Sequence, residues 1–269
     1  MIVPPTSTSG TETPRAANLA FFRAEGLHKR FGGVQAVRDI SLAIPSAIVL
    51  AIIGPNGAGK STLLNLMSGL YQPDAGRIVL DGVDLVGRQA HQRVRLGLGR
   101  TFQKIRLFKN LSALDNVVAG FHIHHAIPAW QYVVHGPAFR RHTTRCREEA
   151  FEFLAFVGLE RRASTLASSL AYGEQRMLEL ARALATSPRL LLIDEPAAGL
   201  NAAEVERLLE RIRILRERGL TVIVVEHNMD LVMNIADRVL VMDYGQFLFE
   251  GTPAEVQRNP AVIAAYLGA

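Results

Sequence analysis

The sequence predicts an α/β protein with a mainly parallel β-sheet, an antiparallel β subdomain near the N-terminus and an inserted helical subdomain. Three short apolar runs carry this prediction, at residues 49–53, 189–193 and 221–225. Each is followed by a helical pattern, which is typical of buried parallel strands covered by helices. Residues 19–44 and 77–85 show short strands joined by turns instead, which favours antiparallel pairing.

The composition suits one large α/β domain, or two subdomains around one core. The 269 residues are 49% hydrophobic and 20% charged, which excludes a disordered or fibrous protein. The net charge of +5 is compatible with a nucleotide, anionic lipid or nucleic acid partner, and equally with an ordinary basic surface. The single cysteine, Cys146, excludes an intramolecular disulfide, and we expect an ordinary surface thiol there rather than a reactive one.

Neither the termini nor any apolar run points to a membrane anchor. No apolar run reaches the roughly 18 residues that a membrane-spanning helix needs. The N-terminus lacks the basic and apolar regions of a signal peptide. Residues 1–18, rich in Pro, Thr, Ser and Gly, are expected to form a disordered tail. We therefore expect a cytoplasmic protein whose link to a membrane goes through a partner.

The N-terminal third is expected to contain mostly strands. They are predicted at residues 19–23, 35–44 and 49–53, and in a hairpin at 77–85 that turns at Asp81-Gly82. Helices are predicted at 62–70 and 89–96, and residues 97–103 form a strand running into a loop. Residues 27–33 are predicted to be a loop. Its aromatic residue Phe31 can stack on a base, although such a residue alone more often serves packing.

Residues 104–169 lack the pattern of alternating strands and helices and predict a helical insertion. With the further helix expected at 174–186, the insertion covers roughly residues 104–186. Asn110 is expected to cap one helix, and a second is predicted at 148–157. Between them lie a basic run at 140–147 and four histidines, which are His122, His124, His125 and His135. These could bind metal, but no pair of histidines four residues apart encloses a carboxylate, so we favour a solvated or partner-facing surface.

The C-terminal part is expected to alternate helices and strands. Asn201 caps a helix that ends at Gly219, because Asn is a good N-cap and Gly a common stop. The further elements are a helix at 229–236, a hairpin with strands at 239–242 and 246–250, and helices at 253–258 and 261–267.

The run Gly-Pro-Asn-Gly-Ala-Gly-Lys-Ser at 54–61 has the spacing of a phosphate-binding loop, between a strand and a helix. The glycines bring backbone N–H groups close to phosphate oxygens, and the helix start adds the positive end of its dipole. Lys60 supplies a charge for the outer phosphates, and the Ser61 hydroxyl suits magnesium. The alternative is a glycine-rich turn with a chance Lys-Ser.

Polar residues end two of the apolar strands. Asp194 and Glu195 follow the apolar run at 189–193. An open α/β sheet binds its ligand at this end of its strands. One carboxylate can hold magnesium or its waters, and the other can accept a proton from an attacking water. The alternative is a helix-capping Asp with a solvated Glu. His227 follows the neighbouring strand and is expected to contact phosphate, and Tyr172-Gly173 precedes a helix that could bind an anion.

Taken together, these motifs resemble those of an ABC-transporter ATPase subunit, from Leu19 to the C-terminus. The segments that carry the resemblance are Phe31, 54–62, Gln103, 170–175, Asp194-Glu195, 199–201 and His227. The resemblance implies that ATP contacts Phe31, Gly54, Pro55, Asn56, Gly57, Ala58, Gly59, Lys60, Ser61, Thr62, Ala171 and Gly173. It implies that Mg²⁺ is held by Ser61, Gln103 and Asp194, and that Glu195, His227, Gln103 and Lys60 are catalytic.

Finer features resemble the branched-chain amino-acid uptake subfamily, whose relatives also serve urea or amides. They lie at residues 100–103, 170–173, 197–201, 226–233 and 265–268. The chain departs from the general family pattern at three positions, where Ala171, Glu174 and Asn201 replace the usual Ser, Gln and Asp. We expect these changes to alter coupling or rate and to leave ATP binding intact.

The resemblance also implies partners. The signature segment of one chain closes on the ATP of a second, so we expect a homodimer or a heterodimer with a sister ATPase. The helical insertion is expected to dock onto a transmembrane permease, with Gln103 as the joint, at the cytoplasmic face of the inner membrane. A periplasmic binding protein would take part indirectly.

Three alternatives remain. The chain could serve another ABC transporter, such as a urea or amide importer or a lipopolysaccharide exporter. A nucleic-acid-associated ABC protein usually has a long coiled coil or two cassettes, and neither is present, so no nucleic acid partner is expected. A P-loop kinase is the third alternative, but it would not explain the motif residues at 199–201 or His227.

Overall fold

The computed structural model of the chain describes residues 20–123 and 137–267. The expected tail at 1–18 and three of the four histidines, His124, His125 and His135, lie outside the described residues.

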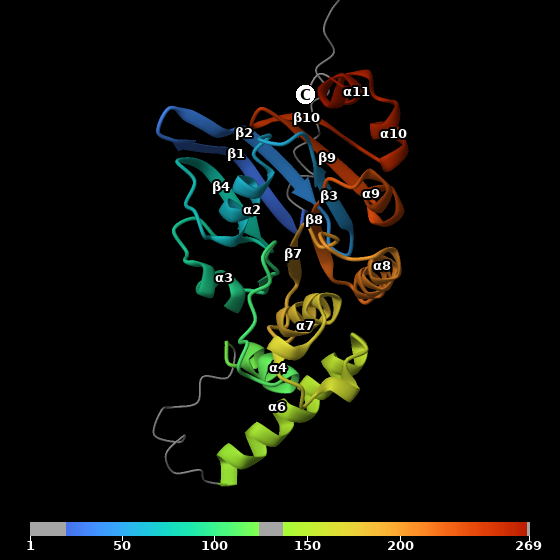
Figure 1. Cartoon of the computed structure of the whole chain (residues 1–269). Helices are drawn as coiled ribbons and strands as arrows, with labels where there is room; N and C mark the ends of the chain where they lie inside the picture. Colours follow the sequence, from blue (N-terminus) through green and yellow to red (C-terminus); the bar gives the residue numbers. More distant parts are fainter. Residues whose placement is uncertain (1–19, 124–136, 268–269) are drawn as a thin grey trace, which may run out of the picture.

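Two β-sheets form the upper part of the molecule in Figure 1. One is antiparallel, with the order β2-β1-β4-β5. The other has six strands in the order β10-β9-β3-β8-β7-β6, parallel except for β10 at one edge. The strands are β1 (Phe22–Phe31), β2 (Val34–Ile44), β3 (Val49–Ile53), β4 (Ala75–Leu80), β5 (Val83–Asp84), β6 (Leu98–Arg100), β7 (Leu190–Asp194), β8 (Thr221–Val225), β9 (Arg238–Asp243) and β10 (Gln246–Gly251).

The three apolar runs form β3, β7 and β8 in the six-stranded sheet, and every residue in them is buried. They are apolar on both faces because both faces are covered. Leu50 and Ile52 face a core shared with the antiparallel sheet, whereas Ala51 and Ile53 face the C-terminal helices. The parallel register places the ends of these strands at one edge, so the loops after Ile53, Asp194 and Val225 lie together.

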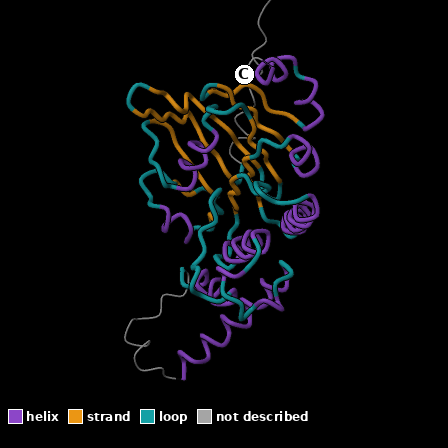
Figure 2. The backbone as a smooth tube through the Cα atoms, in the orientation of Figure 1, coloured by secondary structure: helices purple, strands orange, loops and turns teal. Residues whose placement is uncertain are grey.

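Helices cover both faces of the six-stranded sheet, and a group of them forms the lower end of the molecule (Figure 2). Helix α2 packs between the two sheets, and α4 packs against α6 and α7. The helices are α2 (Lys60–Ser68), α3 (Ala90–Arg95), α4 (Ala113–Phe121), α6 (Pro137–Phe156), η1 (Glu160–Arg162), η2 (Ala167–Ser169), α7 (Tyr172–Leu184), α8 (Ala202–Glu217), α9 (Met229–Ile235), α10 (Pro253–Arg258) and α11 (Pro260–Leu267).

Most expected elements are present, and the strand at 221–225 and the Asn201 cap are confirmed. The loop expected at 27–33 is wrong, because β1 continues to Phe31. Its backbone is hydrogen-bonded to β2 throughout, with β-bulges, and to β4 over most of its length. Such long-range pairing overrides local turn signals.

Four helix starts differ from expectation by two residues or more. Ser112, not Asn110, caps α4, because its hydroxyl accepts the backbone N–H of Asp115 at 3.0 Å. Helices α2 and α7 begin two residues earlier than expected. Helix α6 begins eleven residues earlier.

The expected surface position of Cys146 is wrong, whereas the expectation of an unreactive thiol agrees with its surroundings. The side chain is only 7% exposed and packs in the apolar cluster under the helices. Burial raises the pKa of the thiol, which makes a reactive thiolate less accessible.

No helix within residues 20–123 and 137–267 is long and apolar enough to cross a membrane.

A buried arginine completes the C-terminal end of α2. Arg93 is fully buried and its guanidinium donates to the carbonyls of Leu66 at 2.7 Å, Met67 at 2.8 Å and Arg88 at 3.1 Å. Burial lowers the pKa of Arg93 to about 10. The carbonyl of Leu66 also accepts the N–H of Gly69, and that of Arg88 the side chain of Gln72, so the carbonyl of Met67 at the helix end depends most on Arg93.

We expect Arg93→Met to lower the free energy of unfolding by about 1–3 kcal/mol, because the buried carbonyl of Met67 loses its donor and those of Leu66 and Arg88 each lose one of two. Urea unfolding followed by circular dichroism measures this loss. Arg95, on the same helix but exposed, gives the control Arg95→Met. Equal stability of the two variants would contradict the assigned role of Arg93.

Candidate active site

The loop between β3 and α2 turns at two glycines that no other residue can replace without rearrangement. Gly54 has φ of 151° and Gly59 has φ of 93°. A Cβ atom on Gly54 would collide with the carbonyl of Met242, and one on Gly59 with the carbonyl of Ala36. The backbone N–H groups at the start of α2 are therefore available at the mouth of the loop.

Lys60 is the first residue of α2, and its side chain is buried against the loop. Its ammonium donates to the carbonyls of Gly54 at 2.7 Å and Pro55 at 2.9 Å. Burial lowers the pKa of Lys60, and the charges of Glu195 and Asp194 act against this shift. The ammonium group thus lies in the field of both carboxylates, while Ser61 is exposed at the next position.

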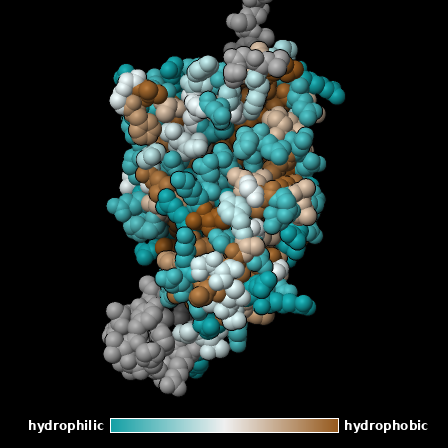
Figure 3. Space-filling model, in the orientation of Figure 1, coloured by the Kyte–Doolittle hydropathy of each residue, from teal (hydrophilic) through white to brown (hydrophobic). Residues whose placement is uncertain are grey.

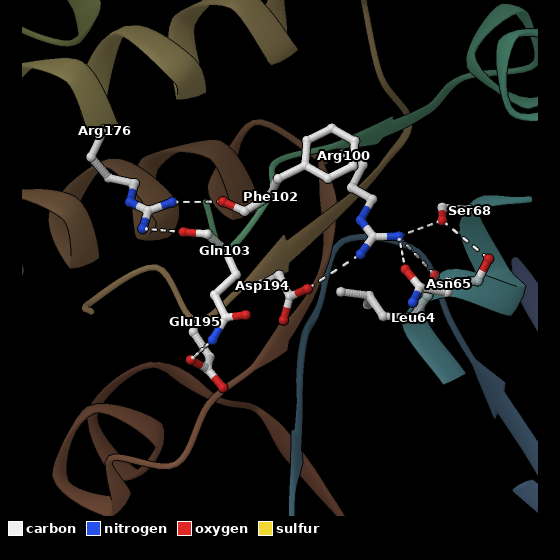
Figure 4. Close-up of polar contacts among 9 residues, drawn as sticks. All are labelled: Leu64, Asn65, Ser68, Arg100, Phe102, Gln103, Arg176, Asp194 and Glu195. Atoms are coloured by element: carbon white, nitrogen blue, oxygen red, sulfur yellow. Dashed lines mark hydrogen bonds and ion pairs between the residues drawn. The ribbon is translucent and has the colours of Figure 1, made fainter. Parts of the chain in front are cut away.

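Asp194 ends β7 inside the protein, with 6% of its surface exposed. The guanidinium of Arg100 donates to its Oδ2 at 3.2 Å and also to Asn65 and Ser68 on α2 (Figure 4). Burial raises the pKa of Asp194, and Arg100 opposes this shift. The other oxygen, Oδ1, is buried and has no hydrogen-bond partner among the described residues. It is the atom of this carboxylate that remains for a ligand.

Glu195 has an unusual backbone conformation for a residue with a side chain. Its φ is 45°, and its N–H donates to the carbonyl of Val225 at 2.9 Å. Its Oε2 accepts a hydrogen bond of 2.6 Å from Nε2 of Gln103, which follows β6 (Figure 4). A non-glycine residue held in this strained region is typical of functional sites. Gln103 and Glu195 thus meet although 92 residues separate them.

Glu226 organises the two loops that follow β7 and β8. It is 1% exposed. Its carboxylate accepts the N–H groups of Ala197 at 3.1 Å, His227 at 3.0 Å and Asn228 at 3.3 Å. Glu226 was missed as a functional residue in the sequence, although it follows an apolar strand just as Glu195 does.

We expect Glu226→Gln to lower kcat for the reaction at this site about tenfold, because small displacements of positioned groups have large rate effects. The amide of Gln has only one acceptor oxygen for the three N–H donors. The free energy of unfolding should therefore also fall by about 1–3 kcal/mol. Steady-state kinetics and urea unfolding measure both effects. The exposed Glu148 gives the control Glu148→Gln. Unchanged kcat in Glu226→Gln would contradict a positioning role.

The ring of His227 is exposed and lines a hollow of about 740 Å³ together with Gly54, Pro55, Asn56, Gly57 and Ala58. His227 therefore faces the glycine-rich loop, as expected from its strand-end position. The far wall of the hollow comes from the β9–β10 turn and from α11.

Three of the expected contact residues lie apart from this hollow. Phe31 is 43% exposed, and its ring packs edge-to-face on Tyr71 with 5.3 Å between the centroids. Ala171 and Gly173 lie at the start of α7. The N–H of Ala171 donates to Glu174 at 3.0 Å, and Gly173 lies against the side chain of Glu204.

Two buried arginines of the site do not stand out in the sequence. Arg100 joins Asp194 to α2, and Arg176 of α7 binds the loop that carries Gln103. Arg100 belongs to the subfamily-like segment 100–103, but that resemblance gives it no role, and no local signal predicts the burial of either arginine, because arginine is usually exposed. Among the described residues, no three His, Cys, Asp or Glu side chains cluster as a metal site would require.

Comparison with known proteins adds independent evidence. The family model described as "ABC transporter" matches residues 37–198, and the one described as "Branched-chain amino acid ATP-binding cassette transporter" matches residues 248–269. The chain is 45% identical to the high-affinity branched-chain amino acid transport ATP-binding protein BraF of Pseudomonas aeruginosa, over 90% of this chain and 96% of BraF. It is 41% identical to LivG of Escherichia coli K12, a protein described in the same words, with the same coverage.

Solved structures agree. A nucleotide-free ATP-binding cassette from an ABC transporter superposes with a TM-score of 0.81 at 29% identity, covering 93% of this chain and 100% of the other. A dimeric cassette in a post-hydrolysis state, bound to ADP and phosphate, gives a TM-score of 0.73 at 26% identity, covering 86% and 98%.

Proposed function

The chain belongs to the ABC transporter family of ATP-binding subunits, and we propose that its ATPase activity powers the import of branched-chain amino acids. One observation carries the catalytic part of the proposal. Lys60, Asp194 and the Gln103–Glu195 pair converge at one edge of the sheet, beside a loop shaped for phosphate. The identity to BraF and LivG over nine-tenths of the chain supports the solute class.

The phosphates of ATP would lie on the loop of residues 54–59. Its N–H groups and the start of α2 favour negative charge, and Lys60 adds a mobile cation. In phosphoryl transfer most of the catalysis comes from positioning and charge stabilisation, which such a loop provides. The ring of Phe31 would stack on the base, at the tip of the β1–β2 hairpin.

Glu195 would orient the attacking water and accept its proton, because it is the partly exposed carboxylate at the strand ends. Gln103, in contact with it, would hold the carboxylate and sense the γ-phosphate. His227 would contact the same phosphate from the neighbouring loop.

The residues present fit a magnesium ion. Asp194 has a buried oxygen without a hydrogen-bond partner among the described residues, and Ser61 and Gln103 offer neutral oxygens at the same edge. When bound, Mg²⁺ neutralises charge on the phosphate oxygens. Arg100 would keep Asp194 oriented for this role.

The separation of Ala171 and Gly173 from the loop of residues 54–59 supports assembly with a second ATPase chain. In such an arrangement the start of α7 of one chain faces the nucleotide of the other, through N–H groups and the helix dipole. The dimeric form of a structurally similar cassette supports the same assembly.

A second hollow, of about 480 Å³, is the proposed docking place for a permease. It lies between the sheet and the helical lower part of the chain. Its walls come from α3, β6, α4 and α7, and include Phe102 and Phe108 of the segment that follows β6. Hydrophobic residues are visible at the surface between these two parts in Figure 3. Docking here would place the chain at the cytoplasmic face of the inner membrane.

The basic run gives less support to a nucleic acid partner. Within it, Arg145 pairs with Glu149 at 2.7 Å and Arg147 with Asp115 at 2.8 Å. These two arginines are already neutralised by neighbouring carboxylates.

Purification of the full chain from its native membrane tests the proposal. We expect a transmembrane permease and a binding protein for branched-chain amino acids to accompany it, and leucine uptake to depend on the chain. Co-purification with DNA or ribosomes, or unimpaired uptake in a deletion strain, would refute the transporter function or its solute.

A further inference from the structure

The loop that carries Gln103 is held by side chains of α7. Residues 101–108, here called the Gln103 loop, contain neither helix nor strand, so their backbone groups need other partners. Arg176 donates to the carbonyls of Phe102 at 2.7 Å and Gln103 at 2.9 Å (Figure 4). Glu179 accepts the N–H of Arg106 at 3.2 Å. The backbone of the loop is thus fixed to the helical part of the chain.

The side chain of Gln103 makes the opposite connection. Its amide binds Glu195, which extends from the central sheet. Any shift of α7 relative to the sheet must therefore alter the Gln103–Glu195 contact or break the bonds of Arg176.

The side chain of Arg176 is buried in this position. Its side chain is 3% exposed and pairs with Glu179, which is 1% exposed, at 3.2 Å. Burial raises the pKa of Glu179, while the N–H of Arg106 and the charge of Arg176 act against this shift. The planar guanidinium reaches several acceptors at once, which an ammonium group on a flexible stem does not.

The same guanidinium also binds the start of α7. Its Nη2 donates to the hydroxyl of Tyr172 at 3.2 Å, and Tyr172 directly precedes Gly173. The Tyr172 ring lies against Gly199, where an added Cβ would come within 2.9 Å of the ring. Arg176 therefore joins the Gln103 loop to the Tyr172–Gly173 turn and, through that ring, to the loop before α8.

We propose that Arg176 is a positioning residue that couples the Gln103–Glu195 contact of one ATP site to the orientation of the Tyr172–Gly173 turn, which serves the second site. This rests on the proposed function as an ATPase with two composite sites. The Tyr172–Gly173 turn and Gln103 then move together. Nucleotide bound at one site therefore changes the orientation of the turn that contacts the nucleotide at the other site. The expected consequence is positive cooperativity in ATP hydrolysis.

The experiment compares Tyr172→Phe, Arg176→Lys and Arg176→Met in the full chain, purified with the chains that accompany it. Tyr172→Phe removes one hydroxyl and leaves the bonds of Arg176 to the Gln103 loop in place. Rates are measured against ATP concentration, nucleotide affinity with a fluorescent ATP analogue, and folding by thermal unfolding. Arg161, exposed near the end of α6, gives the control Arg161→Met.

We expect a wild-type Hill coefficient above 1 that falls to about 1 in Tyr172→Phe, because the hydrogen bond that joins Arg176 to the Tyr172–Gly173 turn is lost. Arg176→Met should lower kcat at least tenfold with nucleotide affinity little changed. It should also lower the unfolding temperature, because the buried Glu179 loses its charge partner and two carbonyls lose a donor. Arg176→Lys should recover part of kcat but not the cooperativity.

Two results would overturn the proposal. One is a wild-type Hill coefficient of 1. The other is a Hill coefficient in Tyr172→Phe that equals the wild-type value, where the wild-type protein is active and its coefficient is above 1. A wild-type protein that does not hydrolyse ATP would instead refute the proposed function itself, so the two failures are distinguishable.

Discussion

Glu195→Gln is expected to bind ATP normally and to lose steady-state hydrolysis by a factor of about 10²–10⁴, the usual contribution of a general base. The amide has nearly the shape of the carboxylate but cannot take a proton from water. Its contact with Gln103 also changes, since two amides meet where an amide met a carboxylate at 2.6 Å. With hydrolysis blocked, ATP should accumulate on the protein and favour the assembled dimer.

Three measurements check this result. Phosphate release gives turnover, a fluorescent ATP analogue gives affinity, and size-exclusion chromatography with ATP gives the fraction of dimer. Glu217→Gln, at an exposed position on α8, is the matched control. Near-normal hydrolysis in Glu195→Gln would remove Glu195 as the base and leave Glu226 or a phosphate oxygen as the remaining acceptors.

Lys60→Ala is expected to lose ATP affinity by about 2–5 kcal/mol, or roughly 30- to 4,000-fold, because a buried cation that pairs with the phosphates is removed. The backbone loop should remain, since its shape depends on Gly54 and Gly59. The loss should therefore appear in binding as well as in hydrolysis. This differs from Glu195→Gln, in which binding is retained.

Isothermal titration with ATP and Mg²⁺ measures this loss directly. The exposed Lys104 gives the control Lys104→Ala, which should bind ATP as the wild type does. A Lys60→Ala protein with unchanged affinity would overturn the assignment of residues 54–61 as the phosphate-binding loop.

The parts that the sequence predicted are those in which neighbouring residues determine the geometry. Strands β3, β7 and β8 are apolar at nearly every position, so both their existence and their burial follow from local pattern. The tight turn between β3 and α2 follows from the glycines at 54 and 59 just before Lys60. The convergence of Asp194 and His227 follows from parallel strands that end at one edge.

The parts that could not be predicted depend on contacts between distant segments. Arg100 reaches Asp194 across 94 residues, and Arg176 reaches Phe102 across 74. Neither arginine differs from a surface arginine in its local sequence. The extension of β1 to Phe31 likewise depends on pairing with β2 and β4, which overcame the glycine pair that follows it. Long-range hydrogen bonds, rather than propensity, decided these features.

The left-handed backbone at Glu195 reverses the usual ranking of substitutions at that position. In ordinary backbone, Ala is more stable than Gly by about 0.5–1 kcal/mol, because Gly loses more freedom on folding. At φ of 45°, a Cβ atom costs about 1–2 kcal/mol, which only Gly avoids. We therefore expect Glu195→Gly to unfold at a higher urea concentration than Glu195→Ala, and the usual order would show that this backbone is not strained in solution. The stability of variants at this position would then follow backbone shape more closely than side-chain size or charge.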